Sequence, residues 1–296
     1  MQQTEILCIG SVLWDVIGRH PNPMPHGADR PGRITRLPGG VALNIAMTLR
    51  RFDLSPVLLS AIGTDEEGRE LFNLCKGMGL NCDYIYRDPD LPTDIYMAIE
   101  GANGLIAAIA DAHSLEAAGD KILTPLADGR LGDVENPYGG VIVLDGNLTE
   151  SLLDQIAHSP LFRAADLRLA PASPGKAERL TPLLNQRNVT LYVNLEEAGV
   201  LCDRCFADSK QAAARLLERG LHRVLVTDGA KMATLGSQNG LVSQTPPQVL
   251  AKRITGAGDS FMAGHIAADL HGHCPQTALE AALSAAAQHV SGDHPK

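Results

Sequence analysis

Short apolar segments alternate along the chain with longer segments whose apolar residues recur every three or four positions. The short runs are typical of buried strands, and the longer spacing is typical of amphipathic helices. The predicted strands are residues 5–12, 56–63, 141–144, 167–170, 190–194 and 223–227. The predicted helices are residues 41–52, 66–78, 150–158, 175–185, 208–219, 256–270 and 275–290. This alternation predicts an α/β fold with a central, mostly parallel sheet covered by helices on both faces.

Two regions depart from this alternation. Residues 20–36 have four prolines in their first dozen positions and no helical period. Residues 94–110 predict a β-hairpin, because apolar and other side chains alternate along its first arm and a Gly-Ala-Asn-Gly segment separates the arms. We expect one domain over residues 1–296 with a small β lid inserted at about 13–37 and 92–112. Since exposed edge strands tend to pair, a homodimer through the lid is expected.

Charge and hydropathy narrow the class of protein. The net charge of −9 disfavours binding to nucleic acid or to an anionic membrane surface. The longest apolar run, residues 105–110, is too short to span a membrane. No basic segment followed by a hydrophobic stretch marks the N-terminus, so we expect a cytoplasmic protein with reduced cysteines.

The strongest chemical motif is Gly256-Ala257-Gly258-Asp259, which opens a predicted helix. Backbone N–H groups at a glycine-rich helix start can bind an anion, and the helix dipole favours negative charge there. A carboxylate in the first turn can accept a proton from an attacking hydroxyl. On spacing alone, a glycine turn with an aspartate cap explains the motif equally well.

Two further elements carry polar groups near predicted strand ends. Gly39 and Gly40 precede a helix in which Asn44 borders the apolar face, so its amide can reach a ligand above the glycines. Asp15 follows the first strand, and α/β sheets bind ligands at the carboxyl ends of their strands. Taken singly, each is also consistent with an ordinary turn.

Together, these motifs resemble the two signatures of the ribokinase-like (PfkB-type) sugar and nucleoside kinases, in the same order and at the usual separation. The resemblance covers nearly the whole chain. It implies a kinase that uses ATP and Mg²⁺ on a small-molecule sugar or nucleoside, with Asp259 as catalytic base. Residues 256–258 then resemble the anion hole. The residues expected to hold the substrate hydroxyls are Asp15, Gly39, Gly40 and Asn44.

The same resemblance implies where the nucleotide binds. Asn194 and Glu197 are similar to an Asn-x-x-Glu element that organises magnesium through a water molecule; alone, they are typical of a capped helix start. Thr227 and Gly229 resemble the nucleotide-phosphate loop after a late strand, and Thr255 is expected on the nucleotide side.

Three positions differ from the family pattern. Met232 replaces a second glycine of the nucleotide loop, and residues 279–289 lack the asparagine frequent in the adenine pocket. Arg253 stands where relatives often have an aspartate that helps to bind a monovalent cation, so the resemblance gives no support for potassium activation.

Within the family, residues 38–46, 59–63, 108–111 and 141–147 are most similar to bacterial pseudouridine kinases. This implies phosphorylation of the primary 5′-hydroxyl of pseudouridine. Asp145 lies where the family often places an acidic substrate contact.

The composition of the lid bears on the substrate. Residues 93–113 contain no lysine or arginine, although a sugar-acid or sugar-phosphate substrate needs a nearby cation. A neutral sugar or nucleoside is therefore favoured, with Arg33 and Arg36 as alternative suppliers of charge. Asp111 and His113 can bind the polar edge of a base, or simply be solvated at the end of the lid.

Two alternatives remain open at this stage. One is a kinase for another neutral sugar or nucleoside, or for a sugar acid such as 2-keto-3-deoxygluconate. The other is a ligand-binding regulator with the same fold that transfers no phosphate, which the intact Gly-Ala-Gly-Asp motif disfavours.

Overall fold

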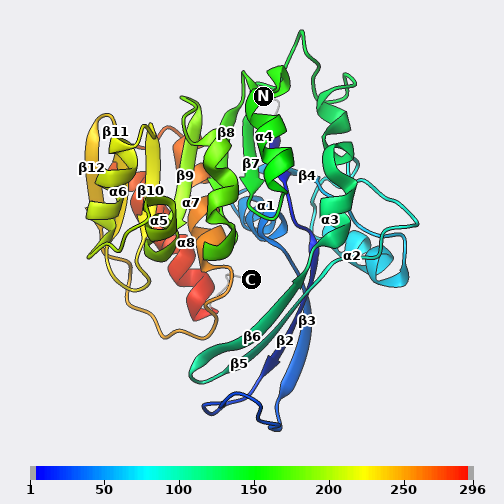
Figure 1. Cartoon of the computed structure of the whole chain (residues 1–296), viewed down its shortest axis with the longest axis vertical. Helices are drawn as coiled ribbons and strands as arrows, with labels where there is room; N and C mark the ends of the chain where they lie inside the picture. Colours follow the sequence, from blue (N-terminus) through cyan, green and yellow to red (C-terminus); the bar gives the residue numbers. More distant parts are fainter. Residues whose placement is uncertain (1–4, 293–296) are drawn as a thin grey trace.

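The computed structural model describes residues 5–292 and contains a large and a small sheet (Figure 1). The strands of the large sheet are β1 (Glu5–Ile9), β4 (Ser55–Leu59), β7 (Val141–Asp145), β8 (Asp166–Ala170), β9 (Val189–Asn194), β10 (Arg223–Thr227), β11 (Ala233–Ser237) and β12 (Gly240–Gln244). Their order across the sheet is β12-β11-β10-β9-β8-β7-β1-β4. Strands β10 to β4 run parallel, and β11 and β12 are added antiparallel at one edge.

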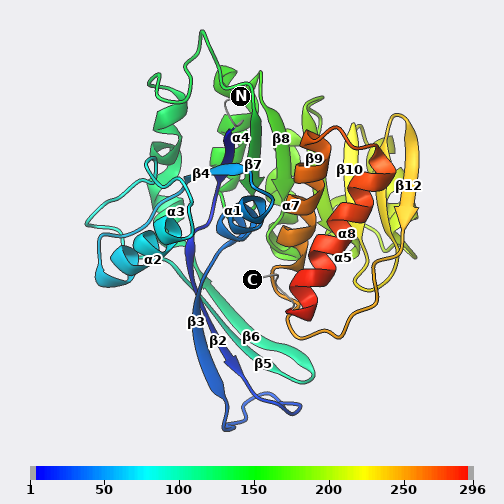
Figure 2. The ribbon, with the colours of Figure 1, turned by 180° about the vertical axis from the view of Figure 1, so that it is seen from behind.

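Helices cover both faces of the large sheet. They are α1 (Val41–Arg51), α2 (Glu66–Gly77), α3 (His113–Ala118), α4 (Glu150–His158), α5 (Leu195–Cys202), α6 (Ser209–Glu218), α7 (Ala257–Leu270) and α8 (Pro275–Ser291), with 3₁₀ helices η1 (Gly119–Leu126), η2 (Pro160–Phe162) and η3 (Pro174–Leu183). Helices α4, α5 and α6 lie on one face, and α1, α7 and α8 lie on the other (Figure 2). Two buried apolar clusters, one on each face, form the core.

The small sheet projects from the body of the molecule (Figure 1). It consists of β2 (Leu13–Arg19), β3 (Arg33–Gly39), β5 (Ile95–Gly101) and β6 (Gly104–Asp111), in the order β3-β2-β5-β6. Strands β5 and β6 form the predicted hairpin, which joins the small sheet and not the large one. The predicted α/β fold with a large parallel sheet and a separate small sheet is therefore confirmed.

The alternating pattern in β5 does not mark a buried face. Met97 and Ile99 are 49% and 43% exposed, whereas Ala98 between them is buried. Met97 pairs directly with Ile109, which is also exposed. Within the described chain, the apolar side of this hairpin faces outward, and the small and polar side chains face the body.

Each of the six predicted strands coincides with one of the parallel strands, because these strands are buried on both faces and therefore strongly apolar. The predicted helix at residues 175–185 is instead the 3₁₀ helix η3, which contains Pro182. The pattern missed β2, β3, β11 and β12; the interior of β3 is largely exposed, so it lacks an apolar signal. Among residues 5–292, no helix is both long and apolar enough to cross a membrane.

Candidate functional site

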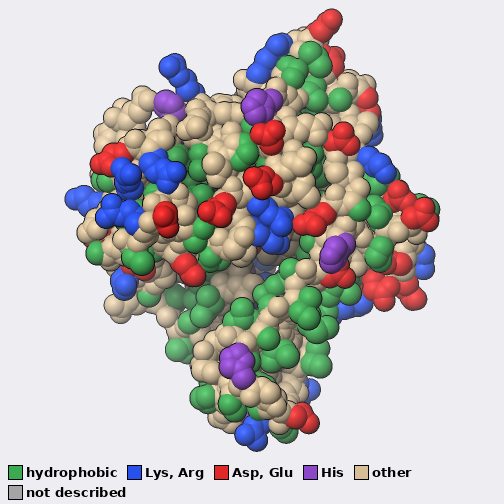
Figure 3. Space-filling view, in the orientation of Figure 1, with side chains coloured by type: hydrophobic (Ala, Val, Ile, Leu, Met, Phe, Trp, Pro, Cys, Tyr) green, Lys and Arg blue, Asp and Glu red, His purple; other side chains and the backbone are tan. Residues whose placement is uncertain are grey.

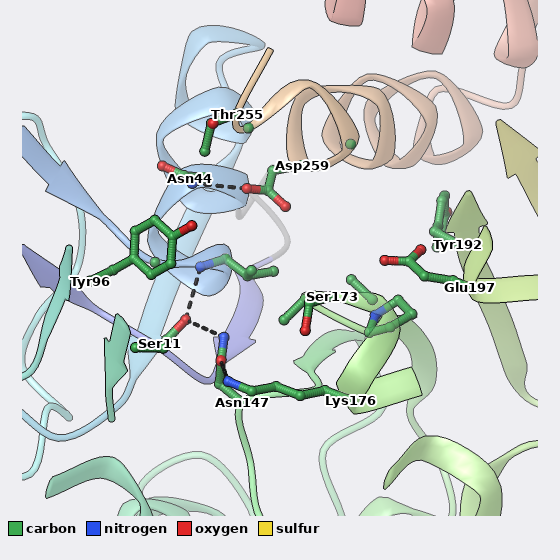
Figure 4. Close-up of a pocket in the computed structure, with 18 of the residues that line it drawn as sticks. Ser11, Asn44, Tyr96, Asn147, Ser173, Lys176, Tyr192, Glu197, Thr255 and Asp259 are labelled. Carbon is green, nitrogen blue, oxygen red and sulfur yellow. Dashed lines mark hydrogen bonds between the residues drawn. The ribbon is translucent and has the colours of Figure 1, made fainter. Parts of the chain in front are cut away.

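A cavity of about 400 Å³ lies at the carboxyl ends of the parallel strands, between α1, the start of α7 and the small sheet (Figure 4). Ser11 follows β1, Asn147 follows β7, Ser173 follows β8 and Asn194 ends β9. Strand ends that are distant in the sequence therefore converge on one pocket, as the parallel topology requires. Its lining includes Ser11, Asp15, Gly40, Asn44, Tyr96, Asn147, Ser173, Lys176, Tyr192, Asn194, Glu197, Thr227, Thr255, Gly256, Gly258 and Asp259.

Asp259 lies in the first turn of α7 and is partly exposed to the pocket. Asn44 of α1 donates a hydrogen bond from Nδ2 to Asp259 Oδ2 at 2.8 Å. Burial raises the pKa of Asp259 to about 7, and the Asn44 hydrogen bond opposes this rise. A carboxylate with this pKa changes its protonation state near neutral pH, and the Asn44 hydrogen bond leaves Asp259 Oδ1 unengaged.

The start of α7 also presents backbone donors. The Ala257 N–H donates to the Ile254 carbonyl at 3.1 Å, so it is occupied in this conformation. Within residues 5–292, the N–H groups of Gly258 and Asp259 have no such partner. Of the predicted anion hole, Gly256 and Gly258 line the pocket, and the N–H groups at the tip of α7 suit an anion.

Asp15 of β2 enters the pocket beside the two glycines. A Cβ on Gly39 would lie 2.1 Å from Asp15 Oδ2, so only glycine leaves room for this carboxylate. Gly40, just before α1, has a φ of 98°, and this positive φ favours glycine. Burial raises the pKa of Asp15 to about 6, and the Arg253 guanidinium opposes that rise.

The structure corrects the role predicted for Asp145. Its carboxylate is fully buried and does not line the pocket. It accepts hydrogen bonds from the backbone N–H groups of Ser11, Ala42 and Asn147 and from the Ser11 hydroxyl, at 2.7–3.2 Å. Asp145 therefore positions Ser11 and Asn147, which do reach the pocket, and holds the start of α1.

Asp111, which was expected to bind the polar edge of a base, does not line the pocket either. Its neighbours Ala110 and Ala112 line the pocket, so the Asp111 side chain points to the other side of the strand end. Asp111 instead pairs with His113 at 2.7 Å, and both side chains are exposed. This is the solvated lid end that was the alternative interpretation.

Asn194 and Glu197 form a capping box at the start of α5. Asn194 Oδ1 accepts from the Glu197 N–H at 2.9 Å, and Glu197 Oε2 accepts from the Asn194 N–H at 2.8 Å. Burial raises the pKa of Glu197, and the capping box engages only Oε2 of this cavity-lining residue. Among residues 5–292, no cluster of three or more metal-ligating side chains occurs. Mg²⁺ usually keeps its waters and takes one or two carboxylates plus phosphate oxygens, so Glu197 fits such a water-mediated site.

The residues predicted to bind the nucleotide lie around the same edge of the sheet. Thr227 lines both the main cavity and a second groove, which Gly229 also lines. Thr255 lines the main cavity, and its Oγ1 donates to Glu100 Oε1 at 3.5 Å. This contact joins β5 of the small sheet to the loop before α7.

Several lining residues escaped sequence reasoning, most importantly Lys176. Its Nζ donates to Asn147 Oδ1, and Asn147 Nδ2 donates to Ser11 Oγ at 2.9 Å (Figure 4). Burial and the nearby Arg179 guanidinium lower the pKa of Lys176, and Asp145 opposes this. The absence of cations from the lid is thus no guide to the charge of the pocket, because Lys176 comes from the segment after β8.

Arg36, one of the two arginines proposed as alternative cations, does not fill that role. Arg36 pairs with Glu70 and lies over the Trp14 ring, 4.2 Å from its centroid. Trp14 is buried on the opposite side of β2 from Asp15. Arg253 is half-buried, and the carboxylates of Asp15 and Asp259 oppose the lowering of its pKa by burial. A fixed positive charge therefore lies near the two site carboxylates.

Comparisons with known proteins identify the family and the fold. A family model described as pfkB family carbohydrate kinase matches residues 3–293. Pseudouridine kinase from Escherichia coli (strain K12) is 29% identical over 88% of this chain and 82% of its own. A carbohydrate kinase from Agrobacterium tumefaciens is 26% identical with a TM-score of 0.79, covering 99% and 94% of the two chains. Ribokinase from Arabidopsis thaliana, solved with ribose and ATP, is 21% identical with a TM-score of 0.76 over 99% and 94%, a likeness of fold.

Proposed function

Because the chain belongs to the pfkB family of carbohydrate kinases, we propose that this pocket transfers a phosphoryl group from ATP to the 5′-hydroxyl of a nucleoside, pseudouridine in particular. The observation that carries the proposal is the convergence of Asp259, Asn44 and Asp15 on one cavity at the start of α7. The pocket combines a carboxylate that can act as the base, side chains that can bind substrate hydroxyls, and backbone N–H groups that can bind an anion.

The chemistry follows from the placement of these groups. The acceptor hydroxyl directs its proton to Asp259 Oδ1 while Asn44 holds Oδ2. The acceptor oxygen forms a bond to the γ-phosphorus, the bond from that phosphorus to the β–γ bridging oxygen breaks, and ADP leaves with the electron pair. The N–H groups of Gly258 and Asp259 hold charge on the migrating phosphoryl group. Since this transition state is loose, alignment contributes most, and the proton moves late.

Magnesium would supply charge neutralisation on the transferred phosphate oxygens. Glu197 would hold this ion through water, and the capping box with Asn194 fixes the direction of that carboxylate. Asp15, with Gly39 against its carboxylate, holds the ribose hydroxyls together with Gly40 and Asn44.

Pseudouridine as acceptor rests on the similarity to the Escherichia coli enzyme and on the acidic lining of the pocket. The three carboxylates of Asp15, Glu197 and Asp259 outnumber the two cations, Lys176 in the lining and Arg253 near Asp15 and Asp259, so a neutral acceptor meets less repulsion than an anionic one. The alternative is a sugar acid of the 2-keto-3-deoxygluconate type, which Lys176 can favour by pairing with its carboxylate.

We also propose that two copies associate through the outward face of the small sheet. Ile34, Met97, Ile99 and Ile109 lie on this face and are 43–79% exposed. Figure 3 shows hydrophobic side chains gathered on the projecting sheet. Sedimentation velocity tests this, with Ile109→Lys expected to lower the mass of the main species; a wild-type monomer at micromolar concentration would contradict it.

The proposed activity is tested by incubating the protein with ATP, Mg²⁺ and one acceptor and identifying the product by mass. A sufficient panel is pseudouridine, uridine, adenosine, ribose and 2-keto-3-deoxygluconate. Phosphorylated pseudouridine without phosphorylated uridine supports the proposal. Transfer only to another acceptor keeps the kinase and replaces the substrate. Bound ATP with no product in any reaction favours the regulator.

A further inference from the structure

We propose that His289 is a positioning residue for phosphoryl transfer: its imidazole holds the peptide before α7 so that the Gly256 N–H faces the migrating phosphoryl group. The inference rests on the proposed function, because it assigns a support to the anion-binding part of the same pocket. His289 lies near the carboxyl end of α8 and is buried. It does not line the cavity, so any effect on the reaction passes through the loop before α7.

The imidazole contacts this loop in two ways. Its Nε2 lies 2.7 Å from the Thr255 carbonyl oxygen, and because a carbonyl only accepts, Nε2 carries a proton and donates the hydrogen bond. The ring also packs against Gly256, where a Cβ would lie 3.0 Å from both Cε1 and Nε2 of His289. Gly256 has a φ of 87°, so glycine both leaves room for the ring and permits the backbone turn.

The hydrogen bond fixes the direction of a donor on the pocket side. The peptide unit between Thr255 and Gly256 is planar and trans, so its C=O and N–H point to opposite sides. With the Thr255 carbonyl held toward His289, the Gly256 N–H points away from His289, and Gly256 lines the cavity. Among residues 5–292, no backbone carbonyl accepts from this N–H. It is therefore oriented for an anion before any ligand binds.

Helix α8 is a firm support for this loop. It runs beside α7 (Figure 2), and a Cβ on Gly264 of α7 would lie 2.7 Å from an α8 side chain, so the two helices are in close contact. Val290 of α8 accepts hydrogen bonds from the N–H groups of Lys252 and Arg253, at 2.9 and 3.2 Å. The segment before α7 is thus attached to α8 at two points, and the His289 contact is the one next to the pocket donor.

The test separates the hydrogen bond from the bulk of the side chain. His289→Gln and His289→Met have side chains of similar length, but only the glutamine amide can donate to the Thr255 carbonyl. The reaction contains ATP, Mg²⁺ and pseudouridine, or the acceptor of the panel that replaces it. We expect His289→Met to lower kcat about 10- to 100-fold and to change the KM of the acceptor at most about 3-fold. His289→Gln should keep kcat within about 3-fold of the wild type.

His271→Met is the matched control. His271 lies at the other end of α7, and its Nδ1 is 2.6 Å from the Ala267 carbonyl oxygen. This variant therefore also removes a contact between a histidine ring and a backbone carbonyl, and we expect kcat and KM within about 2-fold of the wild type. Circular dichroism at the assay temperature gives the folded fraction of each variant, and kcat is expressed per folded protein.

The possible outcomes separate this inference from the proposed function. A kcat of His289→Met close to that of the wild type would overturn the inference and leave the kinase intact. Equal losses in His289→Met and His289→Gln would also overturn it, because the ring and not the donated hydrogen bond would then matter. A loss that appears as a higher KM for the acceptor would contradict a role in the transfer step. Wild-type protein that phosphorylates no acceptor would overturn the proposed function, and the inference with it.

Discussion

The Asp259 carboxylate lines the pocket and accepts a side-chain hydrogen bond from Asn44, whereas the Asp145 carboxylate lies outside the lining and accepts four hydrogen bonds. Asp259 is partly open to the cavity and Asp145 is fully buried. The difference separates two uses of the same residue type. A carboxylate with an unengaged oxygen at a cavity can take a proton, and a carboxylate with both oxygens hydrogen-bonded to its neighbours fixes those neighbours in place.

The largest effect that this comparison predicts is on Asp259. Asp259→Asn keeps the shape and the contact with Asn44 but removes the base. We expect kcat to fall about 10²- to 10⁴-fold, with the dissociation constant of the acceptor changed only a few-fold. Steady-state kinetics and calorimetry measure the two quantities. Near-normal turnover would show that another group accepts the proton.

Replacing Asp145 should lower the stability of the fold more than it affects the chemical step. Asp145→Ala leaves the buried N–H groups of Ser11, Ala42 and Asn147 without their acceptor. We expect the free energy of unfolding to fall by about 3 kcal/mol, measured by urea denaturation. A variant as stable as the wild type would mean that these groups find other partners, and the comparison between the two aspartates would fail.

The pH dependence of activity tests the state of Asp259. Its pKa is raised to about 7, and only the ionised form can accept a proton, so kcat/KM should fall about tenfold per pH unit below pH 7. Asn44 stabilises the ionised form, so Asn44→Ala should move this decline to higher pH. A profile that is flat between pH 5.5 and 8, or unmoved in Asn44→Ala, contradicts the assignment.

The smallest predicted effect concerns Arg36, the cation first considered for the substrate. It is bound to Glu70 and Trp14 on the far side of β2. Arg36→Ala should therefore change kcat/KM by less than about 3-fold and the free energy of unfolding by at most about 1 kcal/mol. A selective loss of affinity for the acceptor would show that Arg36 takes part in substrate recognition.

The start of α7 could be predicted from the sequence better than the group formed by Lys176, Asn147 and Ser11. Asp259 and the glycines before it are neighbours in the chain, so their local pattern predicts a helix start with a base. Lys176, Asn147 and Ser11 meet only because β8, β7 and β1 lie side by side, and neither local spacing nor composition encodes that contact.

The errors have equally physical causes. Asp145 ends a strand in the interior of the large sheet, and its burial depends on packing against Ser11 and α1. Asp111 alternates with Ala110 and Ala112, and the phase of that alternation depends on where β6 pairs with β5, including the irregularity at Ile99 and Glu100. The burial of Asp145 and the orientation of Asp111 both depend on tertiary structure, which the local sequence pattern does not encode.

The measurement that tests the central claim most directly is a single turnover. Protein in excess over ATP is mixed with Mg²⁺ and pseudouridine, quenched over time, and analysed for ADP and phosphorylated nucleoside. If Asp259 and the start of α7 form a kinase site for this acceptor, both products should appear together in equal amounts, and Asp259→Asn should delay both. ATP hydrolysed to ADP and phosphate with no phosphorylated nucleoside, or ATP recovered intact, would contradict the account.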